Sequence, residues 1–122
     1  MNIKLSLIII FFFCALFSPF SLLAAEGKEF DELIKINASD GINQKEAYVI
    51  ARAFFLSEIS GCGFPDEPVK QSGYWVSQTH VGLAGVSGEP IFIDINTGTA
   101  TWKNRSSVVE LTLTELKKKN NK

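Results

Sequence analysis

The sequence is poor in the side chains that most often carry catalysis and metal binding. Its 122 residues contain one histidine, His80, and two cysteines, Cys14 and Cys62. No His/Cys group with the spacing of a zinc site is present, and no Ser/His/Asp set or spaced pair of carboxylates stands out. We therefore expect a protein that is not an enzyme, with no catalytic residue, no metal and no cofactor.

An excess of positive charge is also missing. Lysine and arginine together number 12, and aspartate and glutamate number 13, so the formal net charge is −1 at pH 7. Binding to the phosphates of a nucleic acid requires a clustered basic face. The basic run Lys117–Lys119 lies close to the C-terminus, where such a run is usually solvated. We expect residues 114–122 to be a basic tail and no nucleic acid to be bound.

A long hydrophobic run occurs only near the N-terminus. Lys4 is followed by an apolar stretch over residues 5–17, then by Ser18-Pro19 and by small residues ending at Ala25. A secretory signal peptide has this layout, and the stretch is shorter than the roughly 20 residues that span a bilayer. We expect residues 1–25 to be cleaved, the mature protein to be periplasmic or secreted, and no membrane anchor to remain. An uncleaved anchor is the alternative.

Cleavage at this point would leave Cys62 as the one cysteine of the mature chain, so any disulfide would then join two molecules. Cys62 follows the C-terminus of a predicted helix, where the helix dipole disfavours a thiolate. We expect a small structural cysteine in a turn, with a redox or dimerisation role as the alternative. The sequence leaves the oligomeric state open.

The mature chain begins with two helical segments. Residues 26–41 form a lead-in whose apolar residues have the spacing of a short helix. Asn43 and Glu46 then have the spacing of a capping box, which marks the start of a longer helix. The apolar stripe of this helix is made by Ala47, Ile50, Ala51, Phe54 and Phe55. Such a stripe is typical of a helix that covers a sheet.

The segment Tyr74–Trp102 contains both tryptophans and is predicted to form three short strands joined by glycine-bearing turns. The strands are expected at residues 74–81, 91–95 and 99–102. Asp94 and Gly98 suit the positions of an Asx residue and a left-handed glycine in the second turn. Residues 60–72 contain two prolines and two glycines and are expected to be a loop.

The C-terminal part allows two interpretations. Residues 107–113 favour a fourth strand, whereas Thr112 and Glu115 have the spacing of a capping box that opens a last helix. Both can hold in succession. The expected fold class is α+β, with one main helix packed on a small curved antiparallel sheet of three to four strands, and a short N-terminal helix.

Three of these pieces together resemble the PepSY type of domain, a family of bacterial secreted and membrane-linked proteins that includes protease propeptides. They are Ile42-Asn43-Gln44-Lys45-Glu46-Ala47-x-x-x-Ala51, Tyr74-Trp75-Val76 and Ile93-Asp94-x-x-Thr97-Gly98. The resemblance places such a domain within residues 42–113 and implies an inhibitory or protein-binding role without shared catalytic residues. The Gly82–Gly88 connection and the residues after Trp102 depart from the family's pattern. No protease domain follows, so we expect any inhibition to act on a separate chain.

The same helix, W-x-V strand and hairpin are similar to those of small bacterial immunity proteins of the nuclear-transport-factor-like fold, which protect a cell against a delivered toxin. A small-ligand-binding protein is the third alternative. We expect first a module that binds an envelope or secreted protein and modulates or inhibits an envelope protease or assembly. Exposed aromatic side chains are the candidates for that contact, because they are typical interface anchors. The candidates are Tyr74, Trp75, Phe92 and Trp102.

Overall fold

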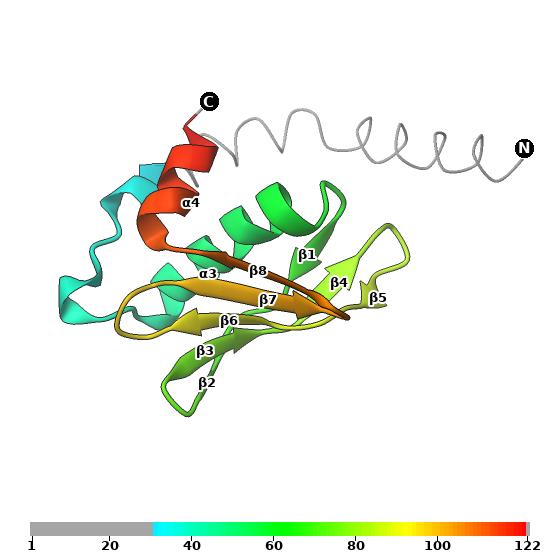
Figure 1. The fold of residues 1–122 in the computed structure, drawn as a ribbon, viewed down its shortest axis with the longest axis horizontal. Coiled ribbons are helices and arrows are strands. Elements are labelled where there is room, and N and C mark those ends of the chain that lie inside the picture. Colours follow the sequence, from blue (N-terminus) through cyan, green and yellow to red (C-terminus); the bar gives the residue numbers. More distant parts are fainter. Residues whose placement is uncertain (1–30, 122) are drawn as a thin grey trace, which may run out of the picture.

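A five-stranded antiparallel sheet, crossed on one face by the helix α3 (Gln44–Phe54), forms the centre of the computed structural model, which describes residues 31–121 (Figure 1). The strand order is β2-β3-β6-β7-β8. The bounds are β2 Val69–Gln71, β3 Tyr74–Ser77, β6 Ile91–Asp94, β7 Ala100–Asn104 and β8 Ser107–Leu111. The expected signal peptide, residues 1–25, lies outside the described residues. Every helix found within residues 31–121 is too short or too polar to span a bilayer.

A smaller three-stranded sheet continues the large one at one end. Its strands, in the order β1-β4-β5, are β1 Gly63–Pro65, β4 Thr79–Val81 and β5 Val86–Ser87. Gln78 alone separates β3 from β4, and residues 66–68 separate β1 from β2, so one bent hairpin runs through both sheets. At the bend, the backbone amide of Asp66 donates to the carbonyl oxygen of Gln78 at 2.7 Å.

The α+β class and the antiparallel pairing agree with the prediction, but the strand count does not. Two strands lie in residues 60–72, where a loop was predicted, and the two sheets exceed the expected three to four strands. The loop prediction was wrong because it treated Pro65 and Pro68 as strand breakers. Both β1 and β2 are edge strands, where proline is tolerated because one side of the strand has no ladder partner.

The start of α3 is fixed by the predicted capping box. The side-chain oxygen of Asn43 accepts from the amide of Glu46 at 2.8 Å, and the Glu46 carboxylate accepts from the amide of Asn43 at 3.0 Å. At its other end α3 passes into a π-helical turn, η2 (Phe55–Ile59), before the chain becomes extended at Ser60. The predicted apolar stripe is fully buried along this length.

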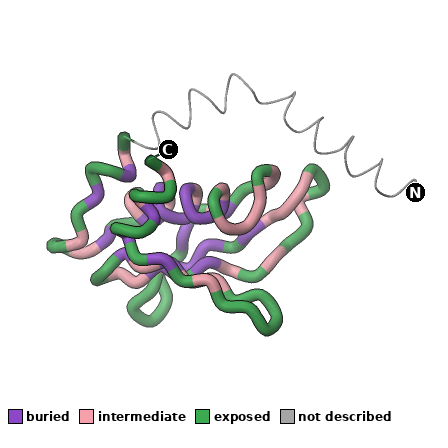
Figure 2. The backbone as a smooth tube through the Cα atoms, turned by 45° about the horizontal axis from the view of Figure 1, so that its top comes forward, coloured by how far each residue is buried: buried purple, intermediate pink, exposed green. Residues whose placement is uncertain are grey.

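The core lies between α3 and one face of the large sheet. Ile93 pairs with Ala100, and Ile91 pairs with Trp102, so these four side chains share that face. Figure 2 shows the buried positions gathered along α3 and the strands that it covers. Leu33, from helical residues 31–35, belongs to the same core, and the short 3-10 helix η1 (Ala38–Asp40) leads from there toward α3.

Both interpretations of the C-terminal part are confirmed, since β8 is followed by a helix, α4 (Leu113–Asn120), with Thr112 and Glu115 as its capping box. Residues 114–122 were expected to be a basic tail, yet most of them lie in α4. Its Leu116 is fully buried in the core. Lys117 Nζ donates to the carbonyl oxygen of Ile36 at 2.8 Å. The basic run therefore belongs to a helix that packs on the domain.

Candidate functional site

The face of the large sheet that is turned away from α3 carries alternate residues of each strand. Strand register places Val69, Val76, Phe92, Thr101 and Glu110 in one row across all five strands. Gln71, Tyr74 and Asp94 form the next row on one side, and Lys103 and Val108 lie in the next row on the other. We call these ten residues the open face.

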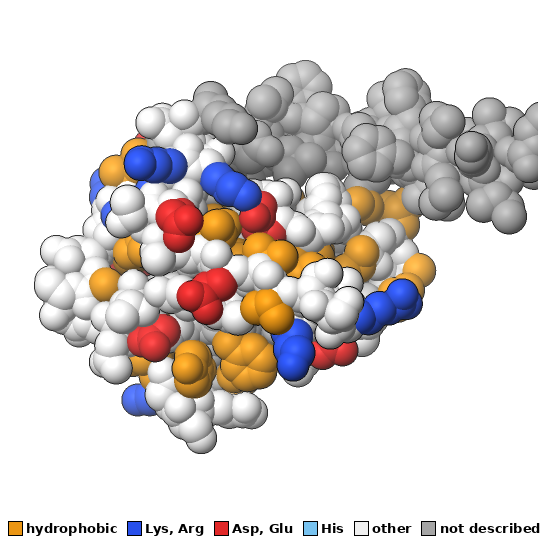
Figure 3. All heavy atoms as spheres, in the orientation of Figure 1, with side chains coloured by type: hydrophobic (Ala, Val, Ile, Leu, Met, Phe, Trp, Pro, Cys, Tyr) orange, Lys and Arg blue, Asp and Glu red, His pale blue; other side chains and the backbone are white. Residues whose placement is uncertain are grey.

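Four of the five hydrophobic side chains on the open face are exposed, whereas Val76 is buried, at 8%. The exposed fractions are 60% for Val69, 42% for Tyr74, 38% for Phe92 and 59% for Val108. The rings of Tyr74 and Phe92 meet edge to face, with their centroids 6.1 Å apart and their planes at 88°. Figure 3 shows hydrophobic side chains gathered over the strands in front, with acidic and basic side chains around them. This face is therefore an apolar strip with an aromatic pair near its middle.

Asp94 lies on the open face at the end of β6, and the β6–β7 turn holds its side chain in place. Its Oδ1 accepts from the amides of Asn96 at 2.8 Å and Thr97 at 3.1 Å. Gly98 adopts the left-handed conformation, with φ at 75°, and its amide donates to the carbonyl oxygen of Asp94 at 2.9 Å. The predicted turn chemistry is confirmed. Asp94 is the cross-strand partner of Tyr74, so the two residues are direct neighbours on the open face.

The structure does not bring the four aromatic candidates together. Trp75 and Trp102 lie on the face that α3 covers, where both pack against the core. The indole N–H of Trp75 donates to the carbonyl oxygen of Ile42 at 2.7 Å, and that of Trp102 donates to the carbonyl oxygen of Glu89 at 2.9 Å. The sequence already indicated that the four cannot share one face, because the adjacent residues Tyr74 and Trp75 of β3 must point to opposite faces of the sheet.

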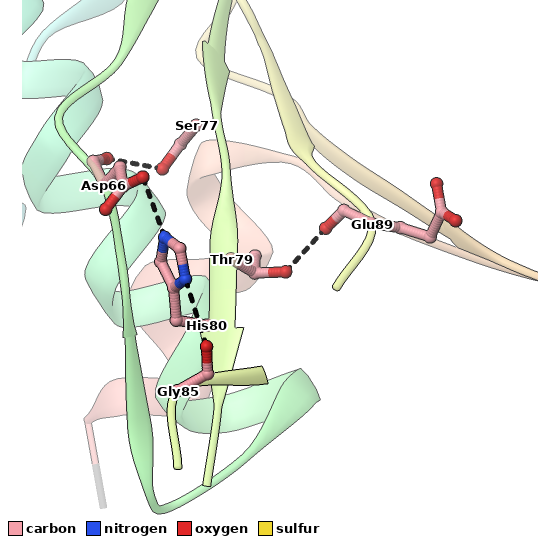
Figure 4. A network of polar contacts seen from close by, with 6 residues as sticks. All are labelled: Asp66, Ser77, Thr79, His80, Gly85 and Glu89. Carbon is pink, nitrogen blue, oxygen red and sulfur yellow. Dashed lines mark hydrogen bonds and ion pairs between the residues drawn. The ribbon is translucent and has the colours of Figure 1, made fainter. Parts of the chain in front are cut away.

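His80, in β4, lies in a network of polar contacts on the smaller sheet (Figure 4). Its Nε2 is 2.8 Å from Oδ2 of Asp66, and its Nδ1 is 3.4 Å from the carbonyl oxygen of Gly85. The ring of Phe64, which is opposite in β1, stacks on the imidazole with a centroid distance of 4.8 Å. One side chain thus joins the β1–β2 connection, β4 and the turn before β5.

Both ring nitrogens of His80 face oxygen atoms that accept hydrogen bonds, so both contacts are satisfied together only by the doubly protonated ring. The hydrogen bond with Asp66 and the charge of that carboxylate raise the pKa of His80 above its ordinary value of 6.5, against the opposing effect of desolvation. The sequence patterns predict a loop over residues 60–72, the segment that contains Asp66. The pairing of β1 with β4 brings Asp66 to His80. This contact was not predicted, because a loop over residues 60–72 has no strand that could pair with β4.

The hydroxyl groups next to this network point to backbone carbonyls. Ser77 Oγ donates to the carbonyl oxygen of Asp66 at 2.6 Å, and Thr79 Oγ1 donates to that of Glu89 at 2.8 Å. Both residues are fully buried. A nucleophilic hydroxyl would instead be bonded to the base that activates it. These contacts fasten the bent strand to its two neighbouring connections.

A groove of about 780 Å³ opens elsewhere on the surface. It lies between residues 34–38, the β6–β7 turn and the start of α4. Its wall carries four threonines and two lysines, and Lys117 is already bonded to the carbonyl oxygen of Ile36. Such a lining suits a small polar molecule.

Cys62, which was expected to be a small structural cysteine in a turn, carries a disulfide in the structure. The other cysteine of the sequence, Cys14, lies outside the described residues. We assign no thiol chemistry to Cys62.

Comparisons of the chain with protein-family models, with curated proteins and with solved structures found no match.

Proposed function

We propose that this protein is an exported, non-catalytic binding module whose open face docks a segment of an envelope or secreted protein. The observation that carries the proposal is the exposed edge-to-face pair of Tyr74 and Phe92 on a face that no described helix covers. Aromatic side chains lose little conformational entropy on binding and dominate the energy of many interfaces. Val69 and Val108 extend the apolar strip toward both edges of the sheet.

The size of the open face favours an extended segment as the partner's contact. Five strands spaced about 4.8 Å apart give a width of about 19 Å, and each strand contributes about four residues of 3.3 Å. Such an area is smaller than the roughly 800 Å² that each partner buries in a standard interface between two globular proteins. A strand or loop of a partner fits this area better than a second broad surface does.

We further propose a PepSY-like domain that modulates or inhibits an envelope protease or assembly. The three segments that carry the resemblance meet in space, which supports this interpretation. Trp75 donates to the carbonyl oxygen of Ile42, and the amide of Ile42 donates to the carbonyl oxygen of Ile95 at 2.7 Å. A Cβ placed on Gly98 would lie 3.4 Å from Ile42 Cδ1. The cap, the W-x-V strand and the turn after β6 thus form one packed unit.

Site-specific photo-crosslinking in the producing cell tests the docking face. A crosslinking amino acid is placed at Val108, on the open face, and in a matched control at Leu83, which has a similar exposed fraction but lies in the β4–β5 turn. We expect a defined adduct from position 108 that is lost on Tyr74→Ala, together with inhibition of the captured protein by purified wild type. Equal adducts from both positions, or adducts indifferent to Tyr74→Ala, would contradict the proposal.

The groove of about 780 Å³ favours small-ligand binding as a second candidate function. A thermal-shift screen against small polar envelope metabolites tests it, with Thr99→Val as the variant that removes one hydroxyl from the wall. A ligand that raises the melting temperature of wild type but not of this variant supports the candidate. A screen in which no compound separates the two proteins counts against it.

A further inference from the structure

We propose that Tyr74, Phe92 and Asp94 form a subsite for a cationic side chain, and that its occupant is an arginine of the docked segment. This inference rests on the proposed function of the open face and adds the chemistry that the partner must present. It starts from two independent features: an exposed aromatic pair and a carboxylate held beside it by a turn.

The aromatic pair offers a ring face to the solvent. Because the planes of Tyr74 and Phe92 meet at 88°, the edge of one ring points at the other, and both residues are exposed to solvent. The face of an aromatic ring carries negative potential and attracts a cation placed within about 6 Å of its centroid. A guanidinium group is the best such cation, because its plane stacks on the ring while its N–H groups point outward.

The carboxylate of Asp94 is preorganised for the second contact. Oδ1 is occupied by the amides of Asn96 and Thr97, whereas Oδ2 has no hydrogen-bond partner within residues 31–121. A side chain that the turn already fixes has little rotational freedom left to lose on binding. Oδ2 can therefore accept from a guanidinium at the short distance of a charge-assisted hydrogen bond.

Geometry allows one arginine to make both contacts. Asp94 and Tyr74 are a cross-strand pair, and such pairs have their Cβ atoms about 4.5–5.5 Å apart. A guanidinium over the ring of Tyr74 is then within reach of the neighbouring carboxylate. The cation–π contact that the described part of the chain makes for itself, Arg52 over Tyr48, belongs to α3 and leaves this place open.

The other charges of the open face suit a cation at this end. Glu110 lies in the same row as Phe92, two strands away, at about 10 Å. Lys103 lies two rows from Asp94, about 13 Å along the strand direction. The Debye length is about 10 Å at 0.1 M salt, so the repulsion from Lys103 is largely screened.

The test uses an acetylated, amidated pentapeptide with a central arginine between valines, and the same peptide with citrulline, the neutral isostere. Nitrogen–proton correlation spectra follow the amides of Tyr74, Asn96 and Thr97 in the purified protein. We expect shifts at these amides with the arginine peptide and a dissociation constant at least about fivefold weaker with citrulline. We expect the same weakening on Asp94→Asn, which keeps an oxygen acceptor for the turn amides and so preserves the fold.

Equal binding of the two peptides, or an Asp94→Asn variant that binds the arginine peptide like wild type, would overturn the subsite. Tyr74→Leu keeps an apolar side chain and must also weaken the arginine peptide. If both peptides bind alike while the adduct at position 108 still depends on Tyr74, the docking face stands and the arginine assignment fails. If that adduct is also missing, both proposals fail.

Discussion

Replacement of Gly63 by alanine is expected to destabilise the domain through contact between two backbones. Gly63 opens β1 with φ at +123°, a conformation that side-chain-bearing residues rarely adopt. A Cβ at this position would lie 2.2 Å from the carbonyl oxygen of His80 and 3.0 Å from Cα of Val81. Both atoms belong to the backbone of β4, so no side-chain rotation relieves the contact. The two strands must separate.

The magnitude follows from two costs. An unfavourable backbone conformation costs about 1–3 kcal/mol. Separation of β1 from β4 also weakens their ladder and the adjoining bond from the amide of Gly82 to the carbonyl oxygen of Cys62, which is 2.9 Å long. Each lost hydrogen bond costs about 0.5–1.5 kcal/mol. With two bonds lost, we expect Gly63→Ala to lower the free energy of unfolding by about 4 kcal/mol, against a total of about 5–15 kcal/mol for a typical domain.

Gly73→Ala is the matched control. Gly73 also has a positive φ, +83°, but a Cβ built on it meets no atom within 4 Å. Its replacement has only the conformational cost, about 1–2 kcal/mol. Urea unfolding followed by the fluorescence of the two tryptophans, which pack against the core, gives both free energies from the midpoint and the slope. Equal losses for the two variants would refute the close approach of β1 to β4.

Three further outcomes are expected. Asp66→Asn should lower the pKa of His80, measured by proton NMR on the one histidine of the chain, because the bond to Asp66 is what raises that pKa. A raised pKa stabilises the fold fully below about pH 6.5 and less as the pH rises through the folded value, so urea midpoints of wild type and Asp66→Asn should converge at alkaline pH. Leu116→Ala should lower the free energy of unfolding by about 2–5 kcal/mol, because Leu116 is fully buried. Lys118→Ala, on the exposed side of α4, should leave that free energy almost unchanged. If the C-terminus were freely solvated, the two variants would be equally stable. Asn43→Ala should cost about 1 kcal/mol through loss of the cap of α3, and an unchanged urea midpoint would show that the cap does not hold the helix.

Features that depend on neighbours in the chain followed from the sequence. The cap formed by Asn43 and Glu46, the buried stripe of α3 and the turn held by Asp94 and Gly98 are all made by residues a few positions apart. Local hydrogen-bond geometry and helical periodicity are enough to specify them. The α+β class follows from the same patterns, since a stripe on a helix needs an apolar sheet face to cover it.

Long-range pairing decided the rest. The strands in residues 60–72 exist because β3 and β4 offer them a partner, although their own glycines and prolines favour a loop. The same pairing places Asp66 against His80, 14 residues further along the chain. Local pattern carries no information on such a contact.

The sequence by itself determined that Tyr74 and Trp75 point to opposite faces of the sheet, because successive side chains of a strand alternate between its two faces. Which of the two faces is covered was decided only by the tertiary structure. α3 packs where Ile91, Ile93 and Ala100 lie. The half-buried Trp75 and Trp102 therefore pack against the core, while Tyr74 and Phe92 stay exposed. The physical reason is that a helix covers the face with the larger continuous apolar area, and that area exists only after the strands have taken their register.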